Sequence, residues 1–193
     1  MAETFYVMNN FPQVILDELR AVYENKEYDV TKEVVPGRFW HYCLNDKNHP
    51  VYRHFSEDFD MIEFYSVSPG FKNSPHLDRG RWCALNIPLD VDLENSFFYA
   101  GKYFHTSHYE WDEQKNAGNS YLHEASEHGP KGFYKWDEDK MEKYNLEKPV
   151  LFSSKVPHGG NNVDGKFLRT IVSIGATNRK YEEVLHRLPP EWF

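Results

Sequence analysis

The chain has 193 residues, which suits one compact domain with a sizeable core, and its 40% hydrophobic content is too high for a disordered chain. Its 22 Lys and Arg against 30 Asp and Glu give a net charge of −8, and without a basic stripe it is a poor partner for nucleic acid. No apolar run reaches the roughly 18 residues of a membrane span, and the first residues lack the pattern of a signal peptide. We therefore expect a cytoplasmic protein that binds neither membrane nor nucleic acid; the sequence leaves its oligomeric state open.

A helix is the first element that the sequence predicts. It begins at Pro12, which suits a first helical position, and its apolar residues recur at spacings of three to four. Short runs of β-branched and aromatic residues follow, separated by Gly, Pro, Asn and Asp, as is typical of strands. The predicted strands are Arg38–Leu44, Asp60–Val67, Arg81–Leu89, Ser96–Ala100, Pro149–Val156 and Phe167–Ala176, with weaker candidates at Thr4–Met8 and Lys131–Trp136. With a second helix over Lys180–Leu188, the fold class is mainly β, antiparallel, with flanking helices.

The segment from residue 102 to residue 147 differs in composition from the rest. It holds six Lys and ten Asp or Glu, and so carries half of the net charge, together with nine aromatic residues and little periodicity. Long irregular connections in compact domains are usually functional lids or disordered excursions, and the aromatic residues favour a folded segment. We expect a single domain, 1–193, in which 102–147 is either a lid or an insertion that packs over the β-domain.

His76 and Asp78 form the most informative pair. In a strand, residues i and i+2 point to the same face, so the imidazole and the carboxylate would lie side by side. They could occupy adjacent positions of a metal ion, and a third ligand from a distant strand would leave three positions open, as non-haem Fe(II) requires. The same His-x-acid pattern recurs at His108 and Glu110, but in the irregular segment. The position of His76 and Asp78 between predicted strands favours them as ligands.

His158 and Arg169 mark a second polar region. His158 follows the predicted strand Pro149–Val156, and a turn rich in Gly, Asn and Asp leads to Phe167–Ala176, where Arg169 lies near the strand start. A buried guanidinium is costly unless it is paired. Its partner could be an Asp or Glu of the core, or the carboxylate of a bound small molecule in a bidentate pair.

The spacing of these residues resembles the core of the 2-oxoglutarate- and Fe(II)-dependent dioxygenases. His158 follows Asp78 by eighty residues, and Arg169 follows after eleven more. The stretch from Tyr65 to His76, Tyr-Ser-Val-Ser-Pro-Gly-Phe-Lys-Asn-Ser-Pro-His, resembles the tyrosine strand, glycine turn and Pro-His of the prolyl-hydroxylase-like branch. The sequence Leu-Asn-Ile-Pro-Leu at 85–89 resembles the strand that follows. The resemblance covers about residues 60–100 and 149–177, and implies a double-stranded β-helix, a cupin-like jelly roll.

The resemblance implies a role for each residue and a set of cofactors. His76, Asp78 and His158 would bind Fe(II), and Arg169 would bind the distal carboxylate of the cosubstrate 2-oxoglutarate. Many members have Arg-x-Ser where this chain has Arg169-Thr170-Ile171, so the hydroxyl partner of that carboxylate must come from elsewhere. The candidate cosubstrate contacts are Tyr65, Ser173 and Asn86. The implied activity is hydroxylation of a small molecule or a peptide side chain with release of succinate and CO₂; ascorbate is a further candidate cofactor.

Two other interpretations remain open from the sequence. A non-oxidative, cupin-like jelly roll would bind metal and a carboxylate ligand without activating O₂. A metal-free interaction module would pair Arg169 with a protein acid and hold His76 and His158 apart. Arg81 follows the His-x-Asp pair, and we expect it to form a surface salt bridge rather than to bind a substrate carboxylate.

Overall fold

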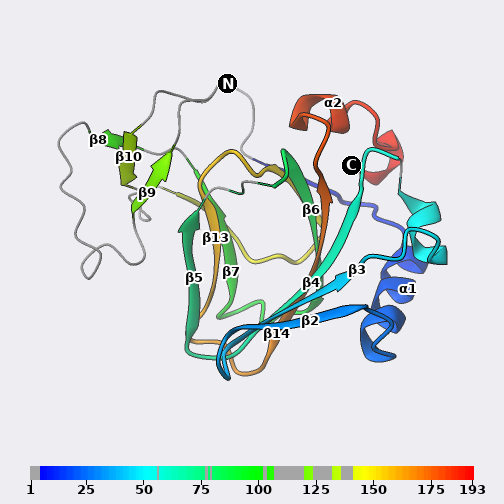
Figure 1. Cartoon of the computed structure of the whole chain (residues 1–193), viewed down its shortest axis with the longest axis horizontal. Helices are drawn as coiled ribbons and strands as arrows, with labels where there is room; N and C mark the ends of the chain where they lie inside the picture. The colour runs from blue at the N-terminus through cyan, green and yellow to red at the C-terminus, as the bar shows by residue number, and fades with distance from the viewer. Residues whose placement is uncertain are drawn as a thin grey trace.

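The structure, a computed structural model, describes residues 5–55, 57–76, 78, 80–101, 104–106, 120–123, 132–135 and 141–193. Figure 1 shows the chain with its elements labelled. In chain order the elements are β1 (Phe5–Val7), α1 (Gln13–Glu24), β2 (Val30–Val35), β3 (Phe39–Leu44), η1 (Pro50–His54), β4 (Met61–Val67), β5 (Phe71–His76), β6 (Cys83–Asp90), β7 (Phe97–Ala100), β8 (Phe104–Thr106), β9 (Ser120–His123), β10 (Gly132–Lys135), β11 (Glu142–Tyr144), β12 (Val150–Ser153), β13 (His158–Asn162), β14 (Arg169–Ala176), α2 (Tyr181–Leu185) and η3 (Pro190–Trp192).

Two antiparallel sheets face each other and form the body of the molecule (Figure 1). The larger sheet has the order β1-β12-β6-β14-β4-β3-β2, and the smaller has the order β11-β7-β13-β5. Consecutive strands from β4 to β7 alternate between the two sheets, and so do those from β11 to β14. Eight strands connected in this way form a double-stranded β-helix, the jelly roll of the cupin type. The predicted fold class is therefore confirmed.

Strand β14 separates two environments, because successive side chains of a strand point to opposite faces. Every residue of this strand is buried. Arg169, Ile171 and Ser173 line a cavity between the two sheets, whereas Val172 and Ile174 belong to the main hydrophobic core. One face of β14 therefore lines the cavity between the sheets, and the other face packs in the main hydrophobic core.

The helices cover the outer face of the larger sheet (Figure 1). Helix α1 buries Ile15, Leu19 and Val22 in the same core as the outer residues of β14, and each such side chain contributes about 1.5–3 kcal/mol. Pro12 is the N-cap residue of α1, so the helix begins at Gln13, one residue later than the sequence predicts. None of the helices in the described part of the chain has the length and apolar character needed to cross a membrane.

The predicted strands are confirmed with ends that differ by at most three residues, but the sequence did not predict the described strands β2, β5, β8, β9, β11 and β13. Strand β13 shows the reason most clearly. The segment that begins at His158 reads His-Gly-Gly-Asn-Asn and predicts a turn, yet it is a strand with β5 on one side and β7 on the other. Hydrogen bonding on both sides outweighs the low strand propensity of Gly and Asn. Gly159 and Gly160 are needed here because a Cβ atom would collide with Tyr99 and Arg169, respectively.

The predicted lid at 102–147 falls largely outside the described residues. Its described parts include a small antiparallel sheet of order β8-β10-β9, drawn beside the barrel in Figure 1, and the edge strand β11. Whether the segment acts as a lid stays a prediction.

Candidate metal centre

A cavity of about 340 Å³ lies between the two sheets. Its apolar walls include Phe98, Phe152 and Ile171, and the pocket side of β3 contributes Phe39 and His41. All of the residues that the sequence predicts for the site line this cavity: His76, Asp78, His158, Arg169, Tyr65, Asn86 and Ser173. Segments that are far apart in the sequence therefore contribute to one connected surface.

Three potential ligands converge in the cavity. Asp78 Oδ1 lies 3.7 Å from His76 Nε2, and Asp78 Oδ2 lies 3.5 Å from His158 Nε2. The two imidazole centroids are 4.5 Å apart, and all three candidate ligand atoms lie within 4.8 Å of one another. Atoms that each bind one ion at about 2 Å lie roughly 3–4 Å apart, so the arrangement fits a metal ion. The closeness of His76 and His158 contradicts the metal-free interaction module, which required them to be apart.

The backbone explains how the three ligands meet. His76 ends β5, His158 begins β13, and the two residues are direct partners in the antiparallel register. Asp78 lies beyond the end of β5, so the strand-face argument from the sequence does not apply to it. Instead, its N–H donates to the carbonyl of Ser154 at 3.0 Å and its own carbonyl accepts from Lys155 Nζ at 2.7 Å. The segment after β12 therefore holds Asp78 beside the histidines.

His158 presents a free lone pair toward this cluster. Its Nδ1 lies 2.8 Å from the carbonyl oxygen of Val156, and because a carbonyl only accepts, Nδ1 carries the proton. In the neutral ring, Nε2 is then an acceptor, and this buried atom has no hydrogen-bond partner among the described residues. A buried lone pair that faces a carboxylate and a second imidazole is suited to binding a cation.

Asp78 is held in its ionised form. Burial alone would raise the pKa of this carboxyl group, but the charge of Arg81 and the contacts with His158 and His76 outweigh burial and hold the pKa far below its usual range. A carboxylate ligand must be deprotonated to bind a metal, so the surroundings prepare Asp78 for that role.

Arg169 lies buried in the same cavity, with 4% of its surface exposed. Its guanidinium packs against Gly160, and its Nε has no hydrogen-bond partner among the described residues. Burial lowers the pKa of Arg169 to about 10, and nearby Tyr99 opposes this shift. Within the described part of the chain no acidic side chain pairs with Arg169, so none of the described carboxylates offsets its buried charge.

The other predicted cosubstrate contacts bond to protein groups. Tyr65 donates its hydroxyl to Glu63 Oε2 at 2.8 Å, and Ser173 donates to Asn86 Oδ1 at 2.7 Å. Their roles toward a cosubstrate stay predictions. Tyr99, which the sequence did not single out, places a second phenol near Arg169 and donates to a backbone carbonyl.

Arg81 is buried, and the expectation of a surface salt bridge is wrong. Its Nε donates to Asp78 Oδ2 at 2.6 Å, and its Nη1 donates to Glu63 Oε2 at 3.1 Å. The stem of Arg81 packs against Gly175, which has no side chain and so leaves room for it inside the domain. Glu63 was missed as well. The signal for it was an acid at a central position of the predicted strand Asp60–Val67, between Ile62 and Phe64.

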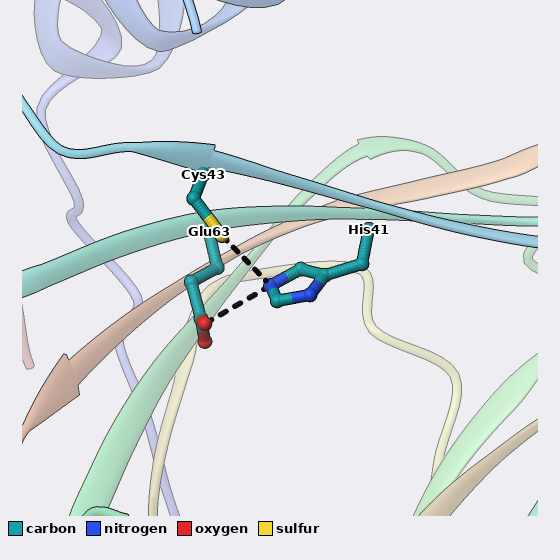
Figure 2. A group of neighbouring side chains, drawn as sticks. All are labelled: His41, Cys43 and Glu63. Carbon is teal, nitrogen blue, oxygen red and sulfur yellow. Dashed lines mark hydrogen bonds and ion pairs between the residues drawn. The ribbon is translucent and has the colours of Figure 1, made fainter. Parts of the chain in front are cut away.

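A second group of potential ligands, His41, Cys43 and Glu63, lies on β3 and β4 (Figure 2). Glu63 Oε1 and Cys43 Sγ approach the same nitrogen, Nε2 of His41, at 3.0 and 3.3 Å. Burial raises the pKa of the Cys43 thiol, whereas metal binding needs a thiolate. Since Glu63 also pairs with Arg81, this group is better described as a hydrogen-bonded cluster than as a metal site.

The fold is shared with solved structures of low sequence identity. EvdMO1 aligns with a TM-score of 0.52 and 14% identity, covering 91% of this chain and 47% of that chain. The non-heme α-ketoglutarate-dependent epimerase SnoN from nogalamycin biosynthesis aligns with a TM-score of 0.50 and 11% identity, covering 90% and 79%. YcfD, a ribosomal oxygenase from Escherichia coli, aligns with a TM-score of 0.46 and 14% identity, covering 94% and 50%.

These comparisons concern the fold. The chain spans about half the length of EvdMO1 and of YcfD. No protein-family model matches the sequence, and no curated protein is similar to it. At identities of 11–14%, the alignments with EvdMO1 and SnoN establish the jelly roll that the strand connections also define.

Proposed function

We propose that this protein is a 2-oxoglutarate- and Fe(II)-dependent oxygenase. The observation that carries the proposal is one cavity that holds a two-histidine, one-carboxylate cluster and a buried guanidinium with no acidic partner among the described residues. The cluster suits Fe(II) with open coordination positions, and the guanidinium suits the far carboxylate of a dicarboxylic acid. SnoN, which shares the fold, is a non-heme α-ketoglutarate-dependent enzyme and supports the same class.

His76, Asp78 and His158 would hold the metal, and Arg169 would bind the distal carboxylate of 2-oxoglutarate. When bound, Fe(II) and 2-oxoglutarate supply the oxidation of a substrate by O₂ with release of succinate and CO₂. The proton on His158 Nδ1 keeps Nε2 free for the metal, and Arg81 keeps Asp78 ionised. The ring of Phe152, 4.7 Å from that of His158, helps to exclude water from the ligands.

The substrate in this proposal is a small molecule or a peptide side chain, and the reaction is hydroxylation. The wall of the cavity formed by β3 and β4 is aromatic, since His41 stacks on Tyr65 at 4.7 Å and Phe39 lies 5.9 Å from the same ring. Such a wall suits an apolar or ring-bearing substrate. The net charge of −8 continues to disfavour nucleic acid.

Anaerobic titration with Fe(II) and 2-oxoglutarate tests the proposal. We expect the weak visible absorption band of the metal–cosubstrate chelate, and slow formation of succinate when O₂ is admitted without a substrate. His76→Ala should abolish both signals because it removes one ligand. His186→Ala is the matched control, since His186 lies on the C-terminal side of α2, away from the cavity, and it should leave both signals intact.

The titration also separates the two classes of function. Metal binding with no chelate band and no succinate would contradict the oxygenase and support a non-oxidative, cupin-like protein. A band with no metal dependence, or equal signals from wild type and His76→Ala, would contradict the ligand assignment.

A further inference from the structure

Charged side chains form a continuous path from Asp78 into the larger sheet. Arg81 Nε donates to Asp78 Oδ2 at 2.6 Å, and Arg81 Nη1 donates to Glu63 Oε2 at 3.1 Å and to Ser173 Oγ at 2.9 Å. Glu63 accepts in addition from the side chains of His41 and Tyr65. Both Arg81 and Glu63 are buried. These contacts fix the guanidinium in one orientation, with acceptors on three sides.

This orientation decides which oxygen of Asp78 is available. Arg81 donates to Oδ2, which also lies 3.5 Å from His158 Nε2, whereas Oδ1 lies 3.7 Å from His76 Nε2 and accepts nothing from Arg81. An oxygen that accepts from a guanidinium has one lone pair fewer for a metal, so Oδ1 is the oxygen better placed to bind one. A single bond from Asp78 leaves one more coordination position open than a bidentate carboxylate would.

We propose that Arg81 and Glu63 are positioning residues for the metal centre: Arg81 holds Asp78 as a one-oxygen ligand, and Glu63 holds Arg81. The inference rests on the proposed function in taking Asp78 as a ligand, but it concerns residues that act through Asp78. Partners of this kind in other metal sites change metal affinity by about 10–100-fold.

Positioning and simple electrostatics predict opposite results, which makes the inference testable. A guanidinium near a dication repels it, so at a pH where Asp78 stays ionised without Arg81, a purely electrostatic role predicts that removal of Arg81 strengthens metal binding. If Arg81 orients Asp78, its removal weakens metal binding although a repulsive charge is lost.

The central experiment measures Co(II) affinity of metal-free protein by calorimetry, without 2-oxoglutarate. Arg81→Lys keeps the positive charge but loses the planar fork that reaches Asp78 and Glu63 together, and we expect affinity to fall about tenfold or more. The visible d–d spectrum of bound Co(II) should also change, since a released Asp78 can bind through both oxygens. Arg53→Gln, which removes one partner of the exposed pair with Glu18, is the charge control and should change neither signal.

Equal or tighter Co(II) binding by Arg81→Lys, with an unchanged spectrum, would overturn the inference while leaving the proposed function standing. Absence of Co(II) binding by the wild type would instead overturn the ligand assignment itself. If Arg81→Lys does not fold, Ser173→Ala removes one acceptor of Arg81 without changing charge. A several-fold loss of affinity in Ser173→Ala then supports positioning, and an unchanged affinity overturns it.

Glu63 is tested by a double-mutant cycle with Glu63→Gln and Arg81→Gln. We expect each single substitution to weaken Co(II) binding about tenfold, and the double substitution to weaken it little more than Arg81→Gln alone, because Glu63 acts through Arg81. If the losses of Co(II) affinity in the two single variants add up fully in the double variant, Glu63 does not act on Asp78 through Arg81.

Discussion

The buried guanidinium of Arg169 destabilises the metal-free protein, because the described residues offer no acid to pair with it. Arg169→Met removes the charge and keeps most of the apolar stem. We expect the free energy of unfolding, measured by urea denaturation without cosubstrate, to rise by about 1–3 kcal/mol. The same variant should lose the affinity for 2-oxoglutarate. Arg169 would then lower the stability of the metal-free protein and in return bind the cosubstrate.

Arg179→Met is the matched control for Arg169→Met. Arg179 donates to the buried carboxylate of Asp58 at 2.9 Å, so its removal should lower the free energy of unfolding. A loss of stability in Arg169→Met similar to that in the control would mean that the guanidinium is paired in the metal-free protein.

Glu63 makes stability depend on pH. Burial alone would raise its pKa, but the hydrogen bond from His41, the charge of Arg81 and the hydrogen bond from Tyr65 outweigh burial, and the pKa is lowered. A carboxyl group with a lowered folded-state pKa stabilises the protein above its unfolded pKa of about 4.3, and this contribution is lost as pH falls through the folded value. The deficit of Glu63→Gln relative to wild type should therefore be largest near pH 7 and shrink below about pH 4, in urea denaturation of the metal-free proteins. A deficit independent of pH would contradict the ionised state of Glu63.

At the scale of elements, His158 begins β13 and Arg169 begins β14, and Asn162 at the end of β13 anchors the connection between the two strands. Asn162 is fully buried, and its Nδ2 donates to the carbonyls of Val67 at 2.9 Å and Phe167 at 3.1 Å. Asn162→Ala should lower the free energy of unfolding by about 2 kcal/mol, because the buried carbonyl of Val67 and the part-buried carbonyl of Phe167 lose their donor. Asn161→Ala, which removes a single contact to the N–H of Val163, should cost less than about 1 kcal/mol. Equal losses in the two variants would contradict the anchoring role.

The same two strands show what the sequence can predict about elements. Phe167–Ala176 is apolar and β-branched and predicts β14 directly, because the local pattern and the tertiary burial agree. β13 has no such pattern, since its Gly and Asn residues become a strand only when β5 and β7 supply hydrogen bonds from both sides. When a strand depends on partners that are distant in the sequence, its own residues do not show the pattern from which a strand is predicted.

At the scale of the whole molecule, the candidate ligands were predictable and their supporting groups were not. The spacing of four residues resembles that of the 2-oxoglutarate- and Fe(II)-dependent dioxygenases, and the sequence alone therefore named them as candidates: His76, Asp78, His158 and Arg169. Glu63 contacts its partners only because β3, β4 and β14 align in one register, which spacing along the chain does not reveal.

The two sheets should become coupled when metal and cosubstrate bind together. His76 and His158 belong to the smaller sheet and Arg169 to the larger, so a dicarboxylate that contacts both the metal and Arg169 would link the sheets. Ligands at about 100 times their Kd stabilise a folded protein by about 2.7 kcal/mol, or about 5–10 °C in Tm for a chain of this size.

We expect Mn(II) and 2-oxoglutarate together to raise Tm by more than the sum of their separate effects, measured by thermal unfolding without substrate. In Arg169→Met the increment from Mn(II) should remain, because the three metal ligands are untouched, and the increment from 2-oxoglutarate should vanish. Purely additive shifts in the wild type would show that the two ligands bind independently, and would contradict a cosubstrate that spans the cavity from the metal to Arg169.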